Sequence, residues 1–394
     1  MWLKTSEYIF VYKMIGVSMD SFSTTTKLEE RLVISATRKR IPLGGSFELL
    51  PLCNMDCRMC FLRLSPKEMR AQGRIRTADE WLALAREAKE AGMLFLLLTG
   101  GEPFLYPEFA RLYRGLAEMG LFLTLNTNGT LITEEYADLL AEHLPRRVNI
   151  TLYGSSDEIY GRLCRNPRGF TQVMRAIHLL QERHVPVKLN GSLTPDNWED
   201  LEKIQQIAHE LDIPLEVDSY MFPSSRKGVC KFDEKARLTP EKAAEGYVKI
   251  RRDELSAEDF RELAKAMAEC YDKEVDFPGE CDPEPLPCRA GLSSFWINWK
   301  GMMTPCVFMD QPEIPVFECG FAKAWESVKQ ERDKLFLPSD CTKCGKRAFC
   351  TVCGACAYTE TGNVQKRPDY MCAMTAEKLR LMAECADEES DSEE

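Results

Sequence analysis

The sequence has no long apolar run and no block of basic residues. Its N-terminal apolar stretch, residues 8–17, is interrupted by Lys13 and is far shorter than the about 20 residues that a membrane span requires. Asp20 and the Ser/Thr run after it form no convincing signal-peptide cleavage site. With 51 Lys and Arg against 62 Asp and Glu, the net charge is −11, and no cluster of cations suits phosphate binding. These absences disfavour a membrane protein and a nucleic-acid-binding protein.

The two ends contain little that a folded core would need. We expect residues 1–40 to be an N-terminal extension, partly disordered, with Met19 as the working start. We expect residues 376–394 to be an acidic tail, disordered from 384 onward, because this segment has almost nothing to bury. A chain of 394 residues has room for two or three domains, or for one barrel plus an extension.

Cysteine, in contrast, is abundant. The chain has 17 cysteines, and eleven of them lie from Cys270 to Cys372, in pairs too close for an ordinary disulfide framework. Without a signal peptide, such clustering is typical of metal ligation in a reducing compartment. The sequence therefore predicts a cytoplasmic metalloprotein.

Between residues 41 and 225 short β-rich apolar runs alternate with helical patterns. The alternation predicts a parallel sheet with right-handed crossovers, and the short continuous runs predict strands covered on both faces. Six repeats are too few for a closed eight-fold barrel, so we expect an α/β fold with a partial (β/α)6 TIM-like barrel and its active site at the carboxyl ends of the strands. The expected strands are 46–52, 94–99, 121–126, 147–152, 185–193 and 215–220, and the expected helices are 77–91, 107–119, 133–143, 169–183 and 197–211.

The first cysteine group follows the first expected strand. Cys53, Cys57 and Cys60 have C-x3-C-x2-C spacing, and three thiolates on one tight loop can hold three corners of a cubic iron–sulfur cluster. No fourth cysteine follows in the loop, so one iron would stay open to a ligand from outside the protein. A structural zinc site is the alternative, but it would normally be closed by four ligands.

A glycine-rich segment, Gly100-Gly101-Glu102-Pro103, ends the second expected strand. Its glycines allow close backbone approach to a ligand, and its carbonyls and carboxylate can accept hydrogen bonds from an ammonium group. Together with the cysteine triplet and the aromatic Phe61 after it, this segment resembles the signature of the radical S-adenosylmethionine (SAM) enzymes. The resemblance implies a 4Fe–4S cluster that binds SAM at its open iron. It also implies reductive cleavage of SAM to a 5′-deoxyadenosyl radical, which removes a hydrogen atom from the substrate.

Polar residues at the ends of the later strands are further candidates for SAM contacts. They are Asn126 and Asn128 after strand three, Thr151 after strand four, and Asn190 in strand five. Arg165 is the candidate for a bidentate contact with the SAM carboxylate. The sequence identifies no catalytic residue.

The C-terminal cysteines follow a helical linker expected at 226–280, and they fill a domain expected at 281–375. A β-hairpin is expected around a Trp299-Lys300-Gly301 turn. The spacing resembles the SPASM extension of radical SAM enzymes, which implies two auxiliary 4Fe–4S clusters, although a pair of zinc ribbons is an alternative. The resemblance implies a distal set, Cys341, Cys344, Cys350 and Cys372, and a nearer set, Cys288, Cys306 and Cys353, with Cys281 as a possible fourth ligand. Cys353 is one residue early for the pattern and Cys356 two late, so the choice between them stays open.

Relatives of this architecture mostly modify ribosomally made peptides. The resemblance therefore implies a radical SAM oxidoreductase that oxidises, and in our first hypothesis cross-links, such a peptide. It also implies an electron donor such as flavodoxin or ferredoxin, and a possible separate leader-recognition protein. A sulfatase-maturing enzyme is the second hypothesis, although Val307 stands where some of those relatives have an acidic residue. A non-enzymatic iron–sulfur electron carrier is the third.

Overall fold

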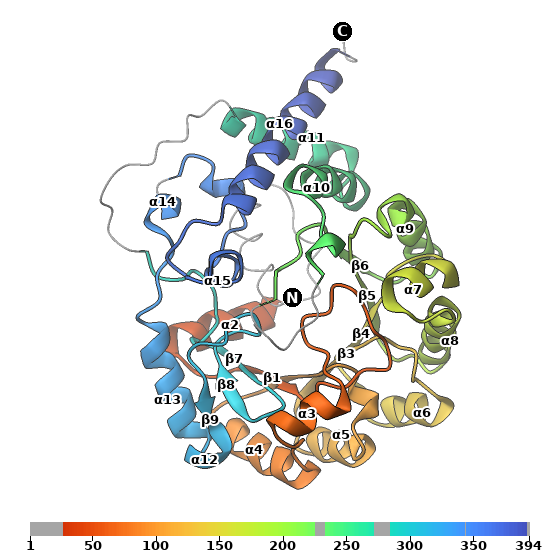
Figure 1. The fold of residues 1–394 in the computed structure, drawn as a ribbon, viewed down its shortest axis with the longest axis vertical. Coiled ribbons are helices and arrows are strands. Elements are labelled where there is room, and N and C mark those ends of the chain that lie inside the picture. The colour runs from red at the N-terminus through yellow and green to blue at the C-terminus, as the bar shows by residue number, and fades with distance from the viewer. Residues whose placement is uncertain (1–26, 225–232, 272–283, 343, 392–394) are drawn as a thin grey trace.

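The computed structural model describes residues 27–224, 233–271, 284–342 and 344–391. One sheet of nine strands, in the order β6-β5-β4-β3-β2-β1-β7-β8-β9, curves through the molecule (Figure 1). Strands β1 to β7 pair in parallel, and β8 and β9 are antiparallel additions. The strands are β1 Gly44–Glu48, β2 Phe95–Thr99, β3 Phe122–Thr127, β4 Arg147–Thr151, β5 Val187–Ser192, β6 Leu215–Asp218, β7 Ser294–Ile297, β8 Met302–Thr304 and β9 Ile314–Pro315.

Helices cover the outside of the curved sheet, as Figure 1 shows. They pack on buried apolar residues that alternate along the strands, such as Phe47 of β1, Leu98 of β2 and Ile150 of β4. The covering helices are α4 Ala78–Glu90, α5 Phe109–Glu118, α6 Glu134–Glu142, α8 Gly169–Glu182 and α9 Leu201–Glu210. The expected α/β partial barrel, with its six strand–helix repeats, is therefore confirmed.

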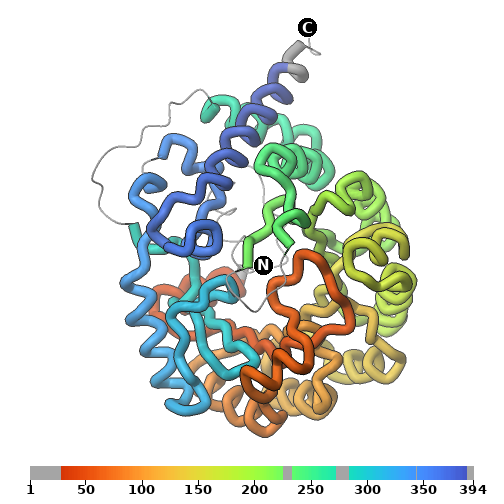
Figure 2. Tube along the Cα trace, viewed as in Figure 1, coloured from red at the N-terminus to blue at the C-terminus, as the bar shows by residue number. Residues whose placement is uncertain are grey.

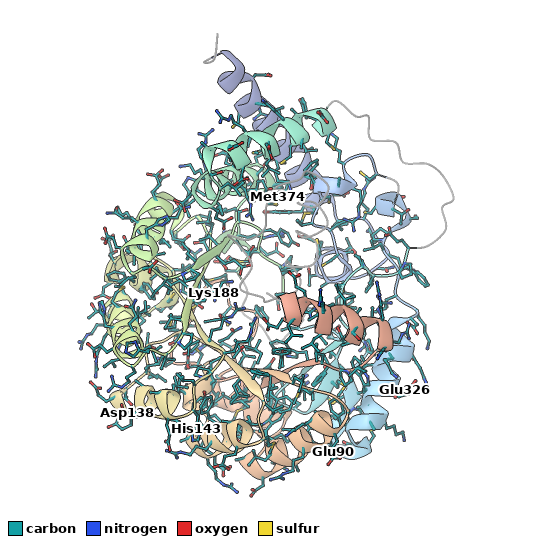
Figure 3. All side chains as sticks on the ribbon, turned by 180° about the vertical axis from the view of Figure 1, so that it is seen from behind. Glu90, Asp138, His143, Lys188, Glu326 and Met374 are labelled. Atoms are coloured by element: carbon teal, nitrogen blue, oxygen red, sulfur yellow. The ribbon has the colours of Figure 1, made fainter. Side chains whose placement is uncertain are left out.

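The strands differ from the prediction in their inner face. Strands β4, β5 and β6 alternate polar and apolar residues, so only their outer face is apolar. Lys188 of β5 and Glu216 of β6 form an ion pair with 2.5 Å between Nζ and Oε2. Lys188 lies near the middle of the molecule, whereas Asp138 and Glu326 lie at its periphery (Figure 3). In β4, β5 and β6 polar residues recur at every second position, which indicates a polar inner face. The prediction that both faces of these strands are apolar was therefore wrong.

The C-terminal hairpin also occupies an unexpected place. Strands β7 and β8 form the hairpin expected around Trp299, but β7 pairs in parallel with β1. The hairpin therefore widens the barrel sheet rather than standing apart from it. Helices α12 Val316–Cys319 and α13 Phe321–Arg332 follow it, and α13 packs against α4.

The remaining elements build the cysteine-rich side of the molecule. Helices α10 Pro240–Glu254 and α11 Ala257–Tyr271 pack against the long helix α16 Asp369–Asp391, and α14 Ser339–Thr342 and α15 Gly354–Thr361 lie between that bundle and the hairpin (Figure 1). Helix α16 includes most of the segment expected to be an acidic tail. The disorder expected from 384 onward was wrong for 384–391, which belong to α16, and the earlier residues Leu379 and Met382 are buried in a cluster with residues of α11.

Within residues 27–224, three α-helices had no counterpart in the sequence-based expectations. They are α2 Lys27–Lys39, α3 Pro66–Gln72 and α7 Asp157–Cys164. Helix α2 occupies part of the extension expected at 1–40 and is tied to the barrel by Glu29, which lies 2.9 Å from Arg146. Within the described ranges, no helix is both long and apolar enough to cross a membrane.

Candidate active site and cysteine sites

The first cysteine loop leaves the carboxyl end of β1 and is held by the backbone of α7. The amide of Asp56 donates to the carbonyl of Cys164 at 3.0 Å, and the amide of Arg58 donates to the carbonyl of Leu163 at 3.1 Å. Both carbonyls belong to the last turn of α7. The last carbonyls of a helix have no amide donor within the helix, so they are available to the loop. The loop therefore depends on a helix that the sequence reading missed.

A second clamp acts through the side chain of Arg58. Its guanidinium lies 2.7 Å from Asp196 and 2.9 Å from Asp233, which belong to different segments. The amide of Asp233 also donates to the carbonyl of Arg58 at 2.9 Å. In Figure 2 the orange loop accordingly runs beside the green segment that begins at residue 233. The loop is thus fixed by three separate parts of the chain.

Two of the three loop thiols accept hydrogen bonds from backbone amides. The Sγ of Cys53 accepts from the amide of Met55 at 3.4 Å, and the Sγ of Cys60 accepts from the amide of Arg63 at 3.3 Å. Amide hydrogen bonds to sulfur are one of the ways in which proteins tune iron–sulfur clusters. The thiols therefore fit a cluster bound at this loop.

The electrostatics of the loop also suit a bound cation. Burial, with the negative charge of Glu102, raises the pKa of Cys53 to about 12. A hydrogen bond with Cys164, followed by burial, raises the pKa of Cys57, and burial raises that of Cys60. Thiolates that are disfavoured by burial and by one another are stabilised by the positive charge of bound iron.

The glycine segment lies directly against this loop. A Cβ on Gly101 would lie 2.2 Å from the carbonyl oxygen of Leu52 and 3.1 Å from the amide nitrogen of Cys53. A Cβ on Gly100, whose φ is +155°, would lie 2.6 Å from the carbonyl oxygen of Leu50. Only glycine permits this approach of β2 to the residues that lead into the cysteines.

Glu102 is fully buried and binds groups of its own chain. Its carboxylate accepts from the hydroxyl of Thr127 at 2.8 Å, from the amide of Asn128 at 2.8 Å and from the amide of Phe104 at 3.1 Å. Burial raises its pKa to about 7. The carboxylate therefore joins the ends of β2 and β3, a role that the sequence did not indicate. Pro103 begins the short 3-10 turn that follows.

Two of the other predicted SAM contacts lie at this rim. The side-chain amide of Asn128 donates to Asn54 at 2.9 Å and lies 3.6 Å from the Sγ of Cys53. Asn126 accepts from Asn149 at 2.7 Å, one strand further along. Asn128 is thus beside the loop, and Asn126 belongs to the polar inner face of the sheet.

The remaining predicted contacts are more scattered. Thr151 and Asn190 are register partners on β4 and β5, and the buried side-chain oxygen of Asn190 has no hydrogen-bond partner within the part of the chain that the structure describes. Arg165 is 64% exposed, and its Nε lies 4.0 Å from Asp56. Arg165 is the residue directly after α7, and its left-handed backbone conformation, with a φ of +54°, ends the helix there. The structure therefore brings Asn190 into the interior and leaves Arg165 at the surface.

The inner face also carries residues that the sequence reading missed. The indole of Trp296 on β7 donates to the buried carboxylate of Glu48 on β1 at 3.1 Å. Burial lowers the pKa of Arg147 on β4. Polar groups at alternate positions of β1, β4 and β5 could have indicated these residues. Buried polar groups lining a barrel interior are suited to orienting a substrate.

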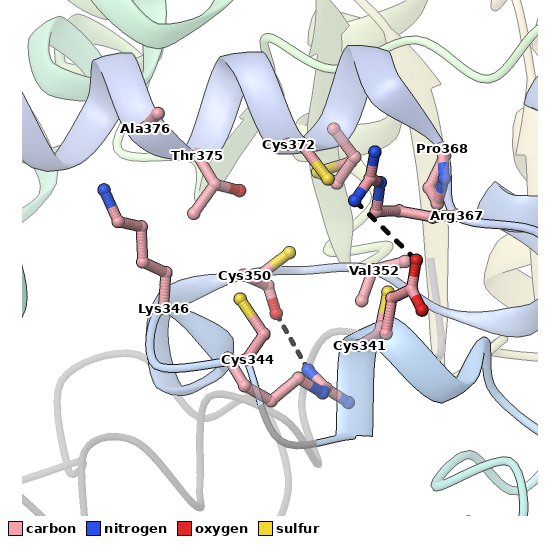
Figure 4. A pocket seen from close by; sticks show the side chains of 13 residues that line it. Cys341, Cys344, Lys346, Cys350, Val352, Arg367, Pro368, Cys372, Thr375 and Ala376 are labelled. Carbon is pink, nitrogen blue, oxygen red and sulfur yellow. Dashed lines mark hydrogen bonds and ion pairs between the residues drawn. The ribbon is translucent and has the colours of Figure 1, made fainter. Parts of the chain in front are cut away.

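In the C-terminal region, four thiols surround one cavity. A space of about 310 Å³ is lined by Cys341, Cys344, Cys350 and Cys372, with apolar residues between them (Figure 4). Burial, followed by the charge of the neighbouring Cys350, raises the pKa values of Cys341 and Cys372 to about 12 and about 11. Within the described ranges, no three or more His, Cys, Asp or Glu side chains are placed to hold a single metal ion. The four thiols therefore line one shared cavity.

The other predicted ligands lie in a neighbouring apolar cluster. It contains Cys288, Cys306, Cys353 and Cys356, all buried. Burial raises the pKa of Cys306 to about 11. Cys281 lies outside the described residues. Cys288, Cys306 and Cys353 thus share one apolar cluster, which also contains Cys341 of the distal set.

Cys353 and Cys356 have different surroundings. The Sγ of Cys353 accepts a hydrogen bond from the amide of Cys356 at 3.4 Å. The Sγ atoms of Cys53 and Cys60 likewise accept from backbone amides. The Sγ of Cys356 instead lies 3.2 Å from the hydroxyl of Tyr220, which donates to Glu360 at 2.8 Å.

Aromatic rings connect the two cysteine regions. The ring centroid of Phe61, next to Cys60, lies 5.1 Å from that of Phe308, which follows Cys306 by two residues. Phe308 in turn stacks on Phe222 at 4.2 Å. These contacts place the segment after the first loop beside the segment that carries Cys306.

The chain matches a known family over its barrel. Residues 47–208 match the model of the Radical SAM superfamily. These residues form a radical SAM domain, and the chain is an enzyme. Enzymes of this superfamily use a 4Fe–4S cluster and SAM, so both are cofactors of this chain. The hypothesis of a non-enzymatic electron carrier is therefore wrong.

Individual relatives extend the likeness beyond that domain. An AdoMet-dependent heme synthase from Methanosarcina barkeri is 24% identical over 339 residues, covering 82% of this chain and 95% of the relative. A PqqA peptide cyclase from Ruegeria pomeroyi is 28% identical over 170 residues, covering 43% and 45%. The crystal structure of Streptococcus suis SuiB bound to the precursor peptide SuiA has a TM-score of 0.63 at 18% identity, covering 94% of this chain and 87% of that one. SuiB therefore shares the fold.

Proposed function

We propose that this enzyme is a maturase that oxidatively modifies, by cross-linking, a ribosomally synthesised peptide. The observation that carries the proposal is the gathering of thiols at two sites of one fold, at the end of β1 and around the C-terminal cavity. Support for a peptide comes from SuiB, whose structure holds a precursor peptide, and from the PqqA peptide cyclase. The structure of anSMEcpe with bound AdoMet and Kp18Cys peptide has the same TM-score of 0.63, at 19% identity, so it supports a peptide substrate as SuiB does, and a sulfatase-maturing enzyme stays the second candidate.

In this proposal Cys53, Cys57 and Cys60 hold the SAM-binding cluster. When bound, the cluster and SAM supply a radical that removes a hydrogen atom from the substrate. The chain's own residues orient and shield these groups. Gly100 and Gly101 offer backbone carbonyls to the SAM ammonium group, and Phe61, Glu102, Pro103, Asn126, Asn128, Thr151, Arg165 and Asn190 complete the proposed SAM site.

The C-terminal cysteines hold two auxiliary 4Fe–4S clusters. The distal set is the one around the cavity of Figure 4. The nearer set is Cys288, Cys306 and Cys353, with Cys281 as fourth ligand. We assign Cys353 rather than Cys356, because its sulfur accepts an amide hydrogen bond as the SAM-loop thiols do. Each event removes two hydrogens from the peptide: a hydrogen atom leaves to the radical and a proton to solvent, while the remaining electron passes to an auxiliary cluster.

The proposed division of labour follows the chain. Residues 41–225 bind SAM, and residues 281–375 hold the auxiliary clusters. Residues 226–280 connect these two parts. A flavodoxin or ferredoxin supplies the electron that starts each turnover. A separate leader-recognition protein is a proposed further partner.

The decisive experiment uses the reduced enzyme, SAM and any short peptide found to be encoded beside its gene, tested at full length and without its N-terminal part. Mass spectrometry should show a loss of two hydrogens per modification, together with 5′-deoxyadenosine. An unaltered peptide, with consumption of a small metabolite instead, would overturn the peptide proposal and leave the enzyme class intact.

The heme synthase relative supports a third candidate, a tetrapyrrole substrate, because the alignment covers 95% of that protein. A porphyrin titration monitored by the absorption of the porphyrin separates it from the peptide candidates. Saturable binding that the Glu48→Gln or Lys188→Met change in the inner face weakens would favour the tetrapyrrole. Absence of saturable binding would eliminate it.

A further inference from the structure

Thr375 lies on α16, one turn after Cys372, and both line the cavity framed by the four distal thiols. Residues three apart on a helix share a face, and Figure 4 shows both side chains on the cavity side of α16. Thr375 is only 3% exposed. Its hydroxyl is therefore held at the cavity and away from bulk water.

The hydroxyl of Thr375 has no hydrogen-bond partner among the described residues. In a helix a threonine hydroxyl ordinarily binds the carbonyl three or four residues earlier, and Thr37 does so with Val33 at 2.8 Å. Leaving a buried hydroxyl unsatisfied destabilises the folded state. Such a group is expected where something other than protein accepts its proton.

The other polar groups of the cavity are already engaged. Arg347 donates to the carbonyl of Cys350 at 3.0 Å, and Arg367 lies 3.7 Å from Asp340. The ammonium of Lys346 lies over the ring of Tyr271, 5.6 Å from its centre. Among the described side chains that line the cavity, the acceptors left without such a partner are sulfur atoms.

We propose that Thr375 is a positioning residue that donates a hydrogen bond to a sulfur of the distal cluster and thereby raises its reduction potential. The inference rests on the proposed binding of a cluster by Cys341, Cys344, Cys350 and Cys372. A hydrogen bond to sulfur stabilises the reduced state, which carries one more negative charge than the oxidised state. Removing the donor therefore makes the cluster harder to reduce.

The test compares Thr375→Val, which keeps the shape and removes the donor, with Thr375→Ser, which keeps the donor. Redox titration of the full, reconstituted enzyme, monitored by electron paramagnetic resonance, gives the potential of the distal cluster. We expect about a tenfold loss in the equilibrium constant for one-electron reduction in the valine variant, which corresponds to about 59 mV. The serine variant should keep the wild-type potential and iron content.

The matched control is Thr351→Val. The hydroxyl of Thr351 already has a partner, the sulfur of Met371 at 3.5 Å, and Thr351 does not line the cavity. Its loss should leave the potential unchanged. Thr375→Ala serves as a second variant without the hydroxyl, so that a packing defect specific to valine does not decide the result.

Two results would overturn the inference. One is an unchanged potential in both Thr375→Val and Thr375→Ala with full iron content, which would mean that the hydroxyl binds water instead. The other is wild-type iron content in Cys341→Ala/Cys372→Ala, which would show that no cluster occupies the cavity. Only the second result also contradicts the proposed function.

Discussion

The two cysteine regions are built in opposite ways. The first takes its three thiols from eight consecutive residues, Cys53 to Cys60, and depends on distant segments only to hold the loop in place. The distal site takes its thiols from α14, from the segment before α15 and from α16, so no short stretch contains it. The first site can therefore be recognised locally, whereas the second exists only when the chain is folded.

The largest effect is expected from replacing the thiols of the first region alone. Changing Cys53, Cys57 and Cys60 together to Ala should abolish SAM cleavage and remove about one third of the iron, because three four-iron clusters become two. Iron analysis and quantitation of 5′-deoxyadenosine provide the measurement. Wild-type protein that binds stoichiometric zinc and little iron would contradict the cluster assignment at both regions.

The second prediction sharpens the comparison inside the C-terminal region. Cys353→Ala should lower the iron content and uncouple the enzyme, so that SAM is still cleaved while modified product falls at least tenfold. Cys356→Ala, the matched control, should keep the iron, because its thiol contacts Tyr220. Loss of iron in the Cys356 variant with none in the Cys353 variant would reverse the assignment.

The same contrast explains what the sequence predicted. The strand order along the chain, the hairpin around Trp299 and the loop at Cys53 follow from local patterns, and the structure has all of them. Helix α7 was missed because its eight residues lie between stronger signals, although its last carbonyls hold Asp56 and Arg58. Nothing in a linear pattern tells that Glu102 binds Thr127, or which face of α16 meets the cavity. Those facts depend on how separate elements pack.

The third prediction tests how tightly the glycine segment supports the first loop. Gly101→Ala would place a methyl group 2.2 Å from the carbonyl of Leu52, which must then move together with Cys53. We expect a loss of about 3 kcal/mol in the free energy of unfolding and reduced retention of the first cluster. Gly44→Ala on β1 is the control, since its methyl group would meet only the carbonyl oxygen of Ser293 at 4.0 Å. Equal effects of the two changes would mean that the segment does not brace the loop.

The smallest effect concerns Glu102, the buried carboxylate beside the first region. Its pKa is raised from 4.5 to about 7 by burial, so the folded enzyme keeps this proton at pH values where the unfolded chain has released it. Between about pH 4.5 and pH 7 the folded state therefore binds more protons, and rising pH must favour unfolding. Relative to Glu102→Gln, the wild-type free energy of unfolding should fall by about 1 to 3 kcal/mol across this window.

Denaturant titrations at several pH values give the free energies of unfolding of the wild type and of Glu102→Gln. The test uses how their difference changes with pH, so a pH-independent loss of stability from hydrogen bonds missing in the glutamine variant does not affect it. Glu108→Gln is the control with the opposite sign. The pKa of Glu108 is lowered by the amide of Ala78 and by Arg111, so this exposed carboxylate stabilises the fold as pH rises. A wild-type stability that rises in parallel with that of the Glu102 variant would show that Glu102 is ionised in the folded enzyme. The carboxylate would then be a fixed negative charge beside Cys53, available to the SAM ammonium group at every pH in the window.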